Sequence, residues 1–458
     1  MASQTTRMKG SGYGNPYIDS LVWGCKWTNG AVTYAFGPAG QDVEGETSLA
    51  FTDAEKQMFR EILQAYASVC NISFKEVPYS TKGKLVNMVE WKAAAIEGSA
   101  DSITLGWHDV PDASYRQNWG LFNSGGDYWS TTRGSLGYST VVHELGHAVG
   151  LAHPHDGGDR PDATVFPGVT GPFDSYGNYS LNQGIWTVMS YNSGWATSMP
   201  PPGMGTGDVI TPMALDIAAL QKIYGANTAY KTGNDSYFLP TANGSGTGWA
   251  CIWDAGGTDT LSAAADTQTA CSINLNPAPL SGPNAGGFVS QLEGVYGGYT
   301  IANNTQIENA TGGNGSDTLT GSGANNTLRG LGGNDQLHGG PGNDILYGGT
   351  GSDGFWFDAA LNASNNVDTI KDFNTSQDSI FLENDIFKKL TGSGELATGN
   401  FVVGKIAIDS NDYIIFNPNN GALLYDADGS GRGAAIQFAV IELTGLVGTP
   451  TCQDFLVV

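Results

Sequence analysis

The sequence predicts two parts in order, a mixed α/β domain and then an all-β domain with glycine-rich turns. Strand and helix patterns alternate up to about residue 225, and helical periodicity is lost after about residue 230. A nine-residue repeat then runs through residues 312–356. A chain of 458 residues can hold two or three domains with separate cores. We therefore expect one domain over residues 1–228 and another over residues 229–458.

The first part contains four segments rich in β-branched and aromatic residues, which predict strands at Ala31–Phe36, Ile72–Val77, Leu85–Trp91 and Ser102–Trp107. Between the first two, Thr52 and Glu55 form a capping box, and the apolar positions that follow repeat at the helical period. A second helix is expected from about Thr140 to Val149. A third begins at the cap Thr211, which is followed by proline, and ends at Gly225.

The composition is globular but acidic. Hydrophobic residues make up 40% of the chain, whereas 44 Asp and Glu against 20 Lys and Arg give a formal charge of −24. This charge argues against nucleic acid as a partner, because phosphates would be repelled. It fits a calcium-loaded protein or a highly soluble secreted one, since hard divalent cations prefer carboxylate ligands. Solubility alone does not explain why the acidic residues cluster with glycine.

The central motif of the first part contains three of the six histidines of the chain, His143, His147 and His153. Positions four apart share one helix face, so that the first two can chelate one ion, and Gly150 allows the sharp turn that returns the third. Three protein ligands leave zinc an open position, which is typical of catalytic sites. Glu144 lies about 100° further round the helix, within reach of a water at the metal without being a ligand itself.

A second element, Thr187-Val-Met-Ser-Tyr, follows the histidines in the chain. A methionine turn beneath the metal histidines accompanies the extended zinc motif, so Met189 is expected to form an apolar floor under the zinc. Tyr191 could then reach the metal or the scissile carbonyl. Outside this context, a methionine near a tyrosine would indicate packing alone.

Over nearly its whole length the chain resembles the serralysins, which are metzincin zinc proteases of the repeats-in-toxin type. The resemblance rests on the segments Tyr17–Gly24, His143–Pro154, Met189–Tyr191, Thr211–Asn227 and Trp253–Thr260 and on the nine-residue repeats. It implies an α/β zincin (metzincin) catalytic domain followed by an all-β domain, a parallel β-roll or β-sandwich that binds calcium.

Carried over by motif, the resemblance makes His143, His147 and His153 the ligands of one catalytic zinc ion. It makes Glu144 the general base and Tyr191 a fifth zinc ligand that swings to stabilise the oxyanion. Glu144 would take the proton of the attacking water and return it to the leaving amine. A strand edge beside the cleft would hold the substrate extended through backbone hydrogen bonds, so we expect broad specificity for protein and peptide substrates.

The repeat follows the pattern G-G-x-G-x-D-x-U-x, in which turn carbonyls and the sixth-position carboxylate wrap calcium and the eighth side chain enters a narrow core. The eighth positions are Leu319, Leu328, Leu337, Leu346 and Phe355. The expected calcium positions are Gly313, Gly315, Asp317, Ala324, Asn326, Gly333, Asp335, Gly340, Gly342, Asp344, Gly349, Gly351 and Asp353. Asn326 in place of Asp and Leu331 in place of Gly weaken two of the sites. Because unbound carboxylates repel one another, folding here should require several calcium ions.

Outside the repeat, the resemblance suggests further calcium positions, with carbonyls at the first two. They are Lys231, Gly233, Asp235, Asp254, Gly256, Asp259 and Glu308. Each could equally be an ordinary turn residue. Asp372 and Asp378 are additional candidates.

The two ends of the chain predict where the protein is located and how it is exported. No apolar signal segment follows Met1, and no run of 18 apolar residues could span a membrane. The end, Asp454-Phe-Leu-Val-Val, resembles the uncleaved export signal of proteins that leave through a type I ABC exporter, although it also fits a last β-strand. We expect a secreted, extracellular monomer that folds in external calcium. Residues 1–16 could form a removable pro-segment.

Several alternatives stay open. Five cysteines permit the pairs Cys25–Cys70 and Cys251–Cys271, or five free thiols with Cys452 among them. The cysteines are unusual for serralysins and leave room for a dedicated processing protease with a cell-surface partner. A calcium-dependent adhesion protein with a vestigial zinc motif is a third class, which the intact Glu144 disfavours. The other three histidines are not expected to bind metal.

Overall fold

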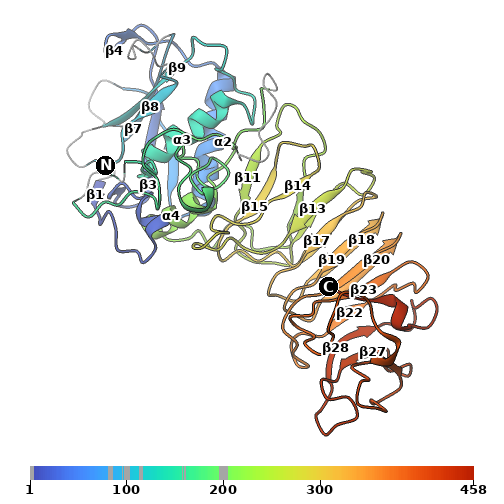
Figure 1. The fold of residues 1–458 in the computed structure, drawn as a ribbon. Helices are drawn as coiled ribbons and strands as arrows, with labels where there is room; N and C mark the ends of the chain where they lie inside the picture. The colour runs from blue at the N-terminus through green and yellow to red at the C-terminus, as the bar shows by residue number, and fades with distance from the viewer. Residues whose placement is uncertain are drawn as a thin grey trace.

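The computed structural model describes residues 5–80, 86–94, 96, 104–112, 117–156, 158, 161–194 and 205–458. The molecule is elongated. Its helices and one sheet gather at the N-terminal end, and a stack of short strands leads away from them (Figure 1). No helix within the described ranges is long and apolar enough to cross a membrane.

The N-terminal part contains a mostly parallel five-stranded sheet among its described residues. Its strands, in spatial order, are β6 (Ser73–Glu76), β3 (Ala31–Phe36), β7 (Met88–Ala93), β9 (Asn118–Asn123) and β8 (Gly106–His108). Only β8 runs antiparallel, and it forms one edge of the sheet. Two further antiparallel strand pairs are β1 (Thr5–Arg7) with β2 (Cys25–Trp27), and β4 (Asp42–Val43) with β5 (Glu46–Thr47).

The helices of this part are α1 (Pro16–Asp19), α2 (Asp53–Val69), α3 (Leu136–Ala148) and α4 (Ala214–Tyr224), with a short 3₁₀ turn η1 (Asn178–Ser180). The predicted capping box opens α2, where the Thr52 hydroxyl accepts from Glu55 N–H and the Glu55 carboxylate accepts from Thr52 N–H. The apolar face of α2 packs with α3 and α4 in one core, in which Phe59, Ile62 and Tyr66 are fully buried.

The strand predictions hold, with shifted bounds where the chain is only partly described. Leu85 and residues 102–103 lie outside the described residues, as does Met1, and the observed strands there are β7 and β8. Strand β9 was not predicted, because Asn118-Trp-Gly-Leu-Phe-Asn carries polar ends and a central glycine.

The predicted start of the third helix at Thr211 is wrong. Met213 is the N-cap residue of α4, and its N–H donates to the Asp216 carboxylate at 2.9 Å. The Thr211 hydroxyl instead accepts the N–H of Cys251 in the following β domain, so it does not cap the helix.

Two ten-stranded sheets make up the C-terminal part. One contains, in order, β10 (Ser236–Phe238), β12 (Thr260–Ser262), β16 (Asn309–Thr311), β18 (Thr327–Gly332), β20 (Ile345–Thr350), β22 (Asp368–Ile370), β28 (Ile436–Ile441), β27 (Ala422–Tyr425), β26 (Ile414–Phe416) and β25 (Phe401–Val403). The other contains β11 (Trp249–Ile252), β15 (Gly298–Ile301), β14 (Ser290–Leu292), β13 (Cys271–Asn274), β17 (Thr318–Thr320), β19 (Gln336–His338), β21 (Gly354–Phe357), β23 (Ser379–Leu382), β29 (Phe455–Val457) and β24 (Gly394–Glu395). Two short 3₁₀ turns, η2 (Thr398–Asn400) and η3 (Cys452–Asp454), accompany them.

The nine-residue repeats alternate between these two sheets. Leu328 pairs with Leu346 in one sheet, and Leu319, Leu337 and Phe355 lie in register in the other. All five side chains are fully buried in a shared core. Each such burial stabilises the fold by about 1.5–3 kcal/mol. Two repeats therefore complete one turn of a parallel β-roll, as the periodic apolar position predicts.

The two parts share a core across the expected boundary at residue 228. Trp249 and Trp253 of the β part belong to the same buried cluster as α3 and α4. Val209 bridges to Trp249, and Ile210 N–H donates to the Trp249 carbonyl at 2.8 Å. The N-terminal part and the start of the β part are thus packed against each other.

The end of the chain forms a strand. Strand β29 lies between β23 and β24 in its sheet, and Asp454 accepts the N–H of Thr451. The strand interpretation of the last residues is therefore confirmed. No disulfide bond joins any two of the five cysteines, and Cys452 alone among them is only partly buried.

Candidate active site

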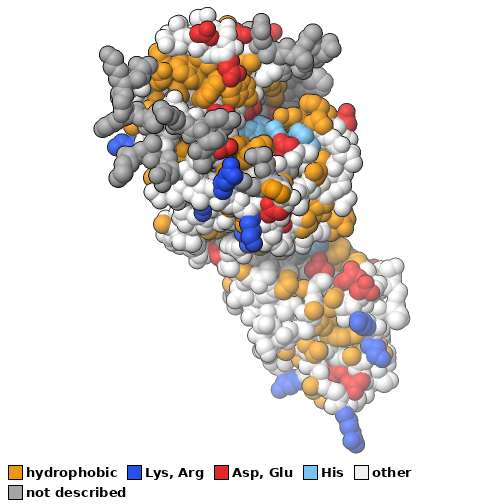
Figure 2. All heavy atoms as spheres, turned by 90° about the vertical axis from the view of Figure 1, so that its left-hand side faces the viewer, with side chains coloured by type: hydrophobic (Ala, Val, Ile, Leu, Met, Phe, Trp, Pro, Cys, Tyr) orange, Lys and Arg blue, Asp and Glu red, His pale blue; other side chains and the backbone are white. Residues whose placement is uncertain are grey.

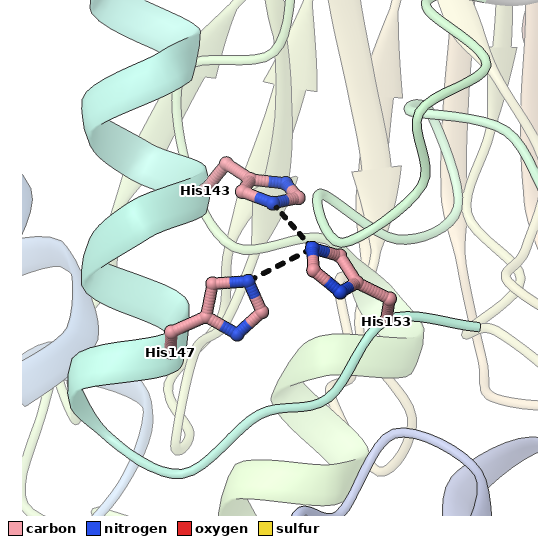
Figure 3. Close-up of side chains that lie close together, drawn as sticks. All are labelled: His143, His147 and His153. Carbon is pink, nitrogen blue, oxygen red and sulfur yellow. Dashed lines mark hydrogen bonds between the residues drawn. The ribbon is translucent and has the colours of Figure 1, made fainter. Parts of the chain in front are cut away.

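His143 and His147 lie one turn apart on α3, and His153 lies on the loop that follows. Figure 3 shows the three imidazoles turned toward a common point. Nε2 of His153 is 3.1 Å from Nε2 of His143 and 2.9 Å from Nε2 of His147. Three converging imidazole nitrogens are a donor set that fits a zinc ion with an open position.

The second nitrogen of each ring is held by an oxygen. The Nδ1 atoms of the two helix histidines lie 2.7 Å from the Val188 carbonyl and 2.9 Å from the Leu151 carbonyl. Nδ1 of His153 lies 2.6 Å from the Asp156 carboxylate. Because Nδ1–H must donate in each case, the tautomer leaves the Nε2 lone pairs free for metal.

The three imidazoles are neutral at pH 7. Burial lowers the pKa of His143 to about 4 and that of His153 to about 2, and it lowers the pKa of His147 well below its usual value. The neutral ring is the form that binds zinc. The pocket therefore needs no deprotonation before it can accept the ion.

Two glycines permit this geometry. Gly150 adopts φ +100°, which turns the chain after α3 and returns His153 to the other two rings, as predicted. Gly146 faces Met189, and a Cβ at this glycine would lie 2.6 Å from the Met189 sulfur. The fully buried methionine thus packs directly against the histidine helix, in the position expected for the floor of the site.

Glu144 lies in the cleft wall and is buried. Burial raises the pKa of its carboxyl to about 8, although the backbone N–H of His108 donates to it and opposes the rise. Strand β8 therefore holds the carboxyl group that the motif assigns as general base, and a cation on the three imidazoles would favour its ionised form.

A buried contact between a histidine and a carboxylate joins β8 to β7. His108 Nε2 is 3.4 Å from the Glu90 carboxylate, and both side chains are inaccessible. Burial opposes protonation of the imidazole, but Glu90 raises its pKa above the usual value. Gly120 on β9 leaves room for the pair, since a Cβ there would lie 2.5 Å from His108.

Tyr191 stands at the mouth of the site. Its ring centroid is 4.7 Å from that of His153 and 5.5 Å from that of His143. The ring is partly exposed, and burial raises the pKa of its hydroxyl to about 12, so the phenol is protonated at neutral pH. The phenol therefore lies beside the imidazoles of His143 and His153.

A cleft of about 450 Å³ passes in front of these groups. One wall is the chain from Thr104 to Gly106 at the edge of the sheet, and the opposite wall contains Val188, Ser190 and Tyr191. Figure 2 shows histidine side chains at the surface of the N-terminal part, bordered by hydrophobic atoms. The cleft can therefore admit an extended chain beside the histidines.

Comparison with known proteins agrees with this geometry. Residues 214–395 match the family described as Peptidase M10 serralysin C terminal. The chain is 31% identical over 283 residues to metalloprotease AprA of Pseudomonas entomophila, covering 59% of this chain and 53% of the relative. It is 29% identical over 334 residues to serralysin of Proteus mirabilis, covering 66% of this chain and 62% of the relative. The predicted resemblance to the serralysins is confirmed.

Serralysin B of Dickeya chrysanthemi is a further relative, 31% identical over 304 residues, which cover 63% of this chain and 58% of the relative. The chain thus spans between half and two thirds of the length of these serralysin relatives.

In the serralysin-like roll, the sixth-position carboxylates form ladders. One oxygen of Asp335 accepts the N–H of Asp317, and one oxygen of Asp353 accepts the N–H of Asp335, each 18 residues apart. Asp344 does the same for Asn326 in the other sheet. The second oxygen, Oδ2, of Asp335, Asp344 and Asp353 is buried without a hydrogen-bond partner. These orphaned oxygens, aimed at glycine turns, fit calcium.

Outside the repeats, three predicted carboxylates converge. Ligand atoms of Asp235, Asp254 and Asp259 lie within 4.8 Å of one another. Asp259 Oδ1 accepts the N–H of Asp235, Asp259 Oδ2 is buried without a partner, and the Glu308 carboxylate accepts the N–H of Asp259. The Lys231 ammonium lies 3.3 Å from Asp235, a side-chain contact that the expected carbonyl role did not include.

Asn326 behaves differently from the aspartates. Its amide nitrogen donates to the carbonyls of Ile307 and Glu308, and its oxygen accepts the N–H of Ser322. The Asn326 amide thus has hydrogen-bond partners within the protein on both its nitrogen and its oxygen. This contact pattern favours the prediction that the calcium site at this repeat is weakened.

Sequence reasoning missed several polar residues around these sites. Asp216 accepts from Thr187 and Val188 at the methionine turn as well as from Met213, and so ties this turn to α4. Asp368 continues the carboxylate ladder beyond the repeats by accepting the N–H of Asp344. Asp368 lies 24 residues after Asp344, so the nine-residue period could not find it. The short spacing from His153 could have pointed to Asp156.

Proposed function

We propose that this chain is a calcium-stabilised zinc endopeptidase with broad specificity. The convergence of three neutral imidazoles beside the buried Glu144 carboxylate carries the proposal. The serralysin relatives support it, and neither the adhesion protein nor the dedicated processing protease is better supported.

His143, His147 and His153 would hold the zinc ion, with Tyr191 at its open side. Zinc, when bound, supplies a Lewis acid that polarises a peptide carbonyl and acidifies water. Glu144 takes the proton of the attacking water on its carboxylate and returns it to the leaving amine. The Tyr191 hydroxyl, which stays protonated, donates to the carbonyl oxygen as negative charge develops there.

The substrate would lie along β8. This strand pairs with β9 on one side only and forms an edge of the sheet, so its other side can pair with an extended peptide. The Thr104–Gly106 segment already forms a wall of the cleft. Backbone pairing accepts many sequences, which accounts for the breadth of specificity.

Calcium would bind in the roll and have a structural role. The proposed positions are the repeat carboxylates and turn carbonyls with the cluster of Asp235, Asp254, Asp259 and Glu308. A chain whose roll folds only with calcium suits export to a calcium-rich exterior through a type I exporter. We propose an extracellular monomer on this ground.

The test is hydrolysis of casein with calcium present. The wild type is compared with Glu144→Ala and with a matched control, Glu61→Ala, on the exposed face of α2. We expect Glu144→Ala to lose at least about 10²-fold in rate while it keeps one zinc ion, and the control to match the wild type. A wild type that binds no zinc, or a Glu144→Ala variant with full activity, contradicts the proposal. Zinc binding without casein hydrolysis favours the dedicated protease.

A further inference from the structure

The cleft continues past the zinc ligands along α3. Its wall includes His143 and Thr140 and reaches Leu136 in the first turn of this helix. At 1.5 Å per residue, the seven residues from Leu136 to His143 span about 10 Å. The cleft therefore extends far enough along α3 to take a long side chain beside the three histidines.

Asp208 lies at the far end of this extension. It contributes to the cleft lining, and its N–H donates at 2.9 Å to the carbonyl of Gly134, immediately before the N-cap of α3. The zinc ligands and Asp208 thus lie at opposite ends of the same two turns of α3. Val209 and Val188 give this extension apolar walls.

The Asp208 carboxylate has no partner among the described residues. Its backbone makes hydrogen bonds to Gly134 and Trp249, but no described donor reaches its side chain. No Lys or Arg is among the described lining residues, and Glu144 is the other carboxylate there. Burial raises the pKa of Asp208 to about 6, so it is ionised at neutral pH. Asp208 is half-buried. An anion partly withdrawn from water without a counter-charge is unfavourable, and a cation entering the cleft would compensate it.

We propose that Asp208 forms the base of a specificity pocket that selects substrates with arginine or lysine beside the scissile bond. The inference rests on the proposed function and deepens it, because it concerns the same site. Long basic side chains match both the apolar walls of the pocket and the carboxylate at its base. Their methylene stems contact the apolar walls, and their charged ends reach the carboxylate. Other positions of the substrate, held by backbone pairing with β8, stay unselective.

The first measurement is the digestion of a peptide library derived from a whole proteome, with cleavage sites read by mass spectrometry. We expect Arg and Lys to be enriched at one fixed position next to the cleaved bond. Two fluorogenic peptides that differ only by Arg or Leu at this position then give the ratio of their kcat/KM values. The ratio should be about tenfold or more for the wild type and fall to about twofold or less in Asp208→Asn.

Two variants control this result. Asp208→Glu keeps the charge and should retain the preference for a basic residue. Asp385→Asn makes the same charge change in an exposed turn of the β part and should leave the ratio unaltered. A wild type without basic preference, or an Asp208→Asn variant with an unchanged ratio, overturns the proposal.

A binding measurement separates this proposal from the proposed function. Zinc-loaded protein is titrated in a calorimeter with two short peptide hydroxamates that carry Arg or Leu in the pocket position. Tighter binding of the Arg compound that is lost in Asp208→Asn supports the pocket even if no peptide is hydrolysed. Equal binding of both compounds to the wild type overturns the pocket even if casein is cut.

Discussion

The buried carboxylates of the two parts of the molecule differ in their hydrogen-bond partners. In the N-terminal part, Glu55 accepts from the Lys92 ammonium at 2.7 and 2.9 Å and from the Trp129 indole, and these bonds lower its pKa although burial opposes ionisation. In the roll, each of Asp335 and Asp344 accepts one backbone bond on one oxygen and has no partner on the other.

This difference indicates how each part is stabilised. In the N-terminal part, the buried carboxylates of Glu55 and Glu90 lie against the side chains of Lys92 and His108, so these two have protein partners and need no metal ion. The roll has buried carboxylate oxygens without hydrogen-bond partners along its turns, which favours the proposal that calcium is part of its structure. Metal removal should therefore separate the two parts experimentally.

The largest expected effect is the unfolding of the roll when calcium is removed. In calcium-free protein supplied with one equivalent of zinc, we expect amide hydrogen exchange over residues 312–356 to lose its protection, by about 10³-fold or more. Helices α2 and α3 should stay protected, because their carboxylates have protein partners. Mass spectrometry of exchanged peptides measures both regions in one sample. Protection that persists in the repeats without calcium would contradict the comparison.

The sequence could predict the features that depend on residues close together in the chain. Both metal motifs are local in sequence, since helical spacing places His143 beside His147 and the nine-residue period places each leucine inside the roll. The helix starting with a capping box at Thr52 was equally local, and it is confirmed.

Tertiary contacts account for what was missed. Thr211 resembles a cap, but its hydroxyl bonds Cys251 across the domain junction, and Asp216 caps α4 instead. Asp208 and Glu90 carry no motif, and their importance depends on a cleft and on a neighbouring strand. The spacing of the cysteines could not decide whether the two candidate disulfide pairs form, and the structure contains no disulfide bond among the five cysteines.

The next largest effect is expected at the proposed zinc site. The Nδ1 atoms of the other two histidines lie against backbone carbonyls, whereas Nδ1 of His153 lies against the side-chain carboxylate of Asp156. Asp156→Ala should weaken zinc binding by about 10–100-fold, because the ring loses its orientation and basicity. Competition with a chromogenic zinc chelator measures the affinity. Asp162→Ala removes an exposed carboxylate in the same part of the chain and should bind zinc like the wild type. Equal affinity in both variants would show that the Asp156 bond does not support the site.

A smaller effect is expected from pH on the calcium-free roll. Burial raises the pKa of Asp335 and Asp344 to about 7 from 3.8. The folded roll therefore binds more protons than the unfolded chain between roughly pH 4 and 7, and its stability falls as the pH rises through this window. Circular dichroism of calcium-free protein should show more β-structure at pH 5 than at pH 8.

Two comparisons sharpen this pH experiment. The double variant Asp335→Asn with Asp344→Asn removes two of the titrating groups and should reduce the pH dependence, while Asp353, Asp368 and Asp378, whose pKa values burial also raises, still titrate. With calcium present the trend should reverse, because protons compete with the ion for the carboxylates. A calcium-free wild type that gains structure as the pH rises would exclude these carboxylates as the source.

The smallest effect tests a single departure from the repeat. Leu331 occupies a glycine position of the pattern and has φ +79°, where a side chain is strained. Leu331→Gly should stabilise the calcium-loaded roll by about 1 kcal/mol, since the strain of about 1–3 kcal/mol relieved exceeds the entropic cost of glycine. The midpoint of urea unfolding in the presence of calcium measures this change.

Thr318→Gly, in an extended strand, is the control and should instead lower stability by about 0.5–1 kcal/mol. If both variants lower the midpoint, the Leu331 backbone is not strained, and the roll tolerates this departure from its repeat without a loss of stability.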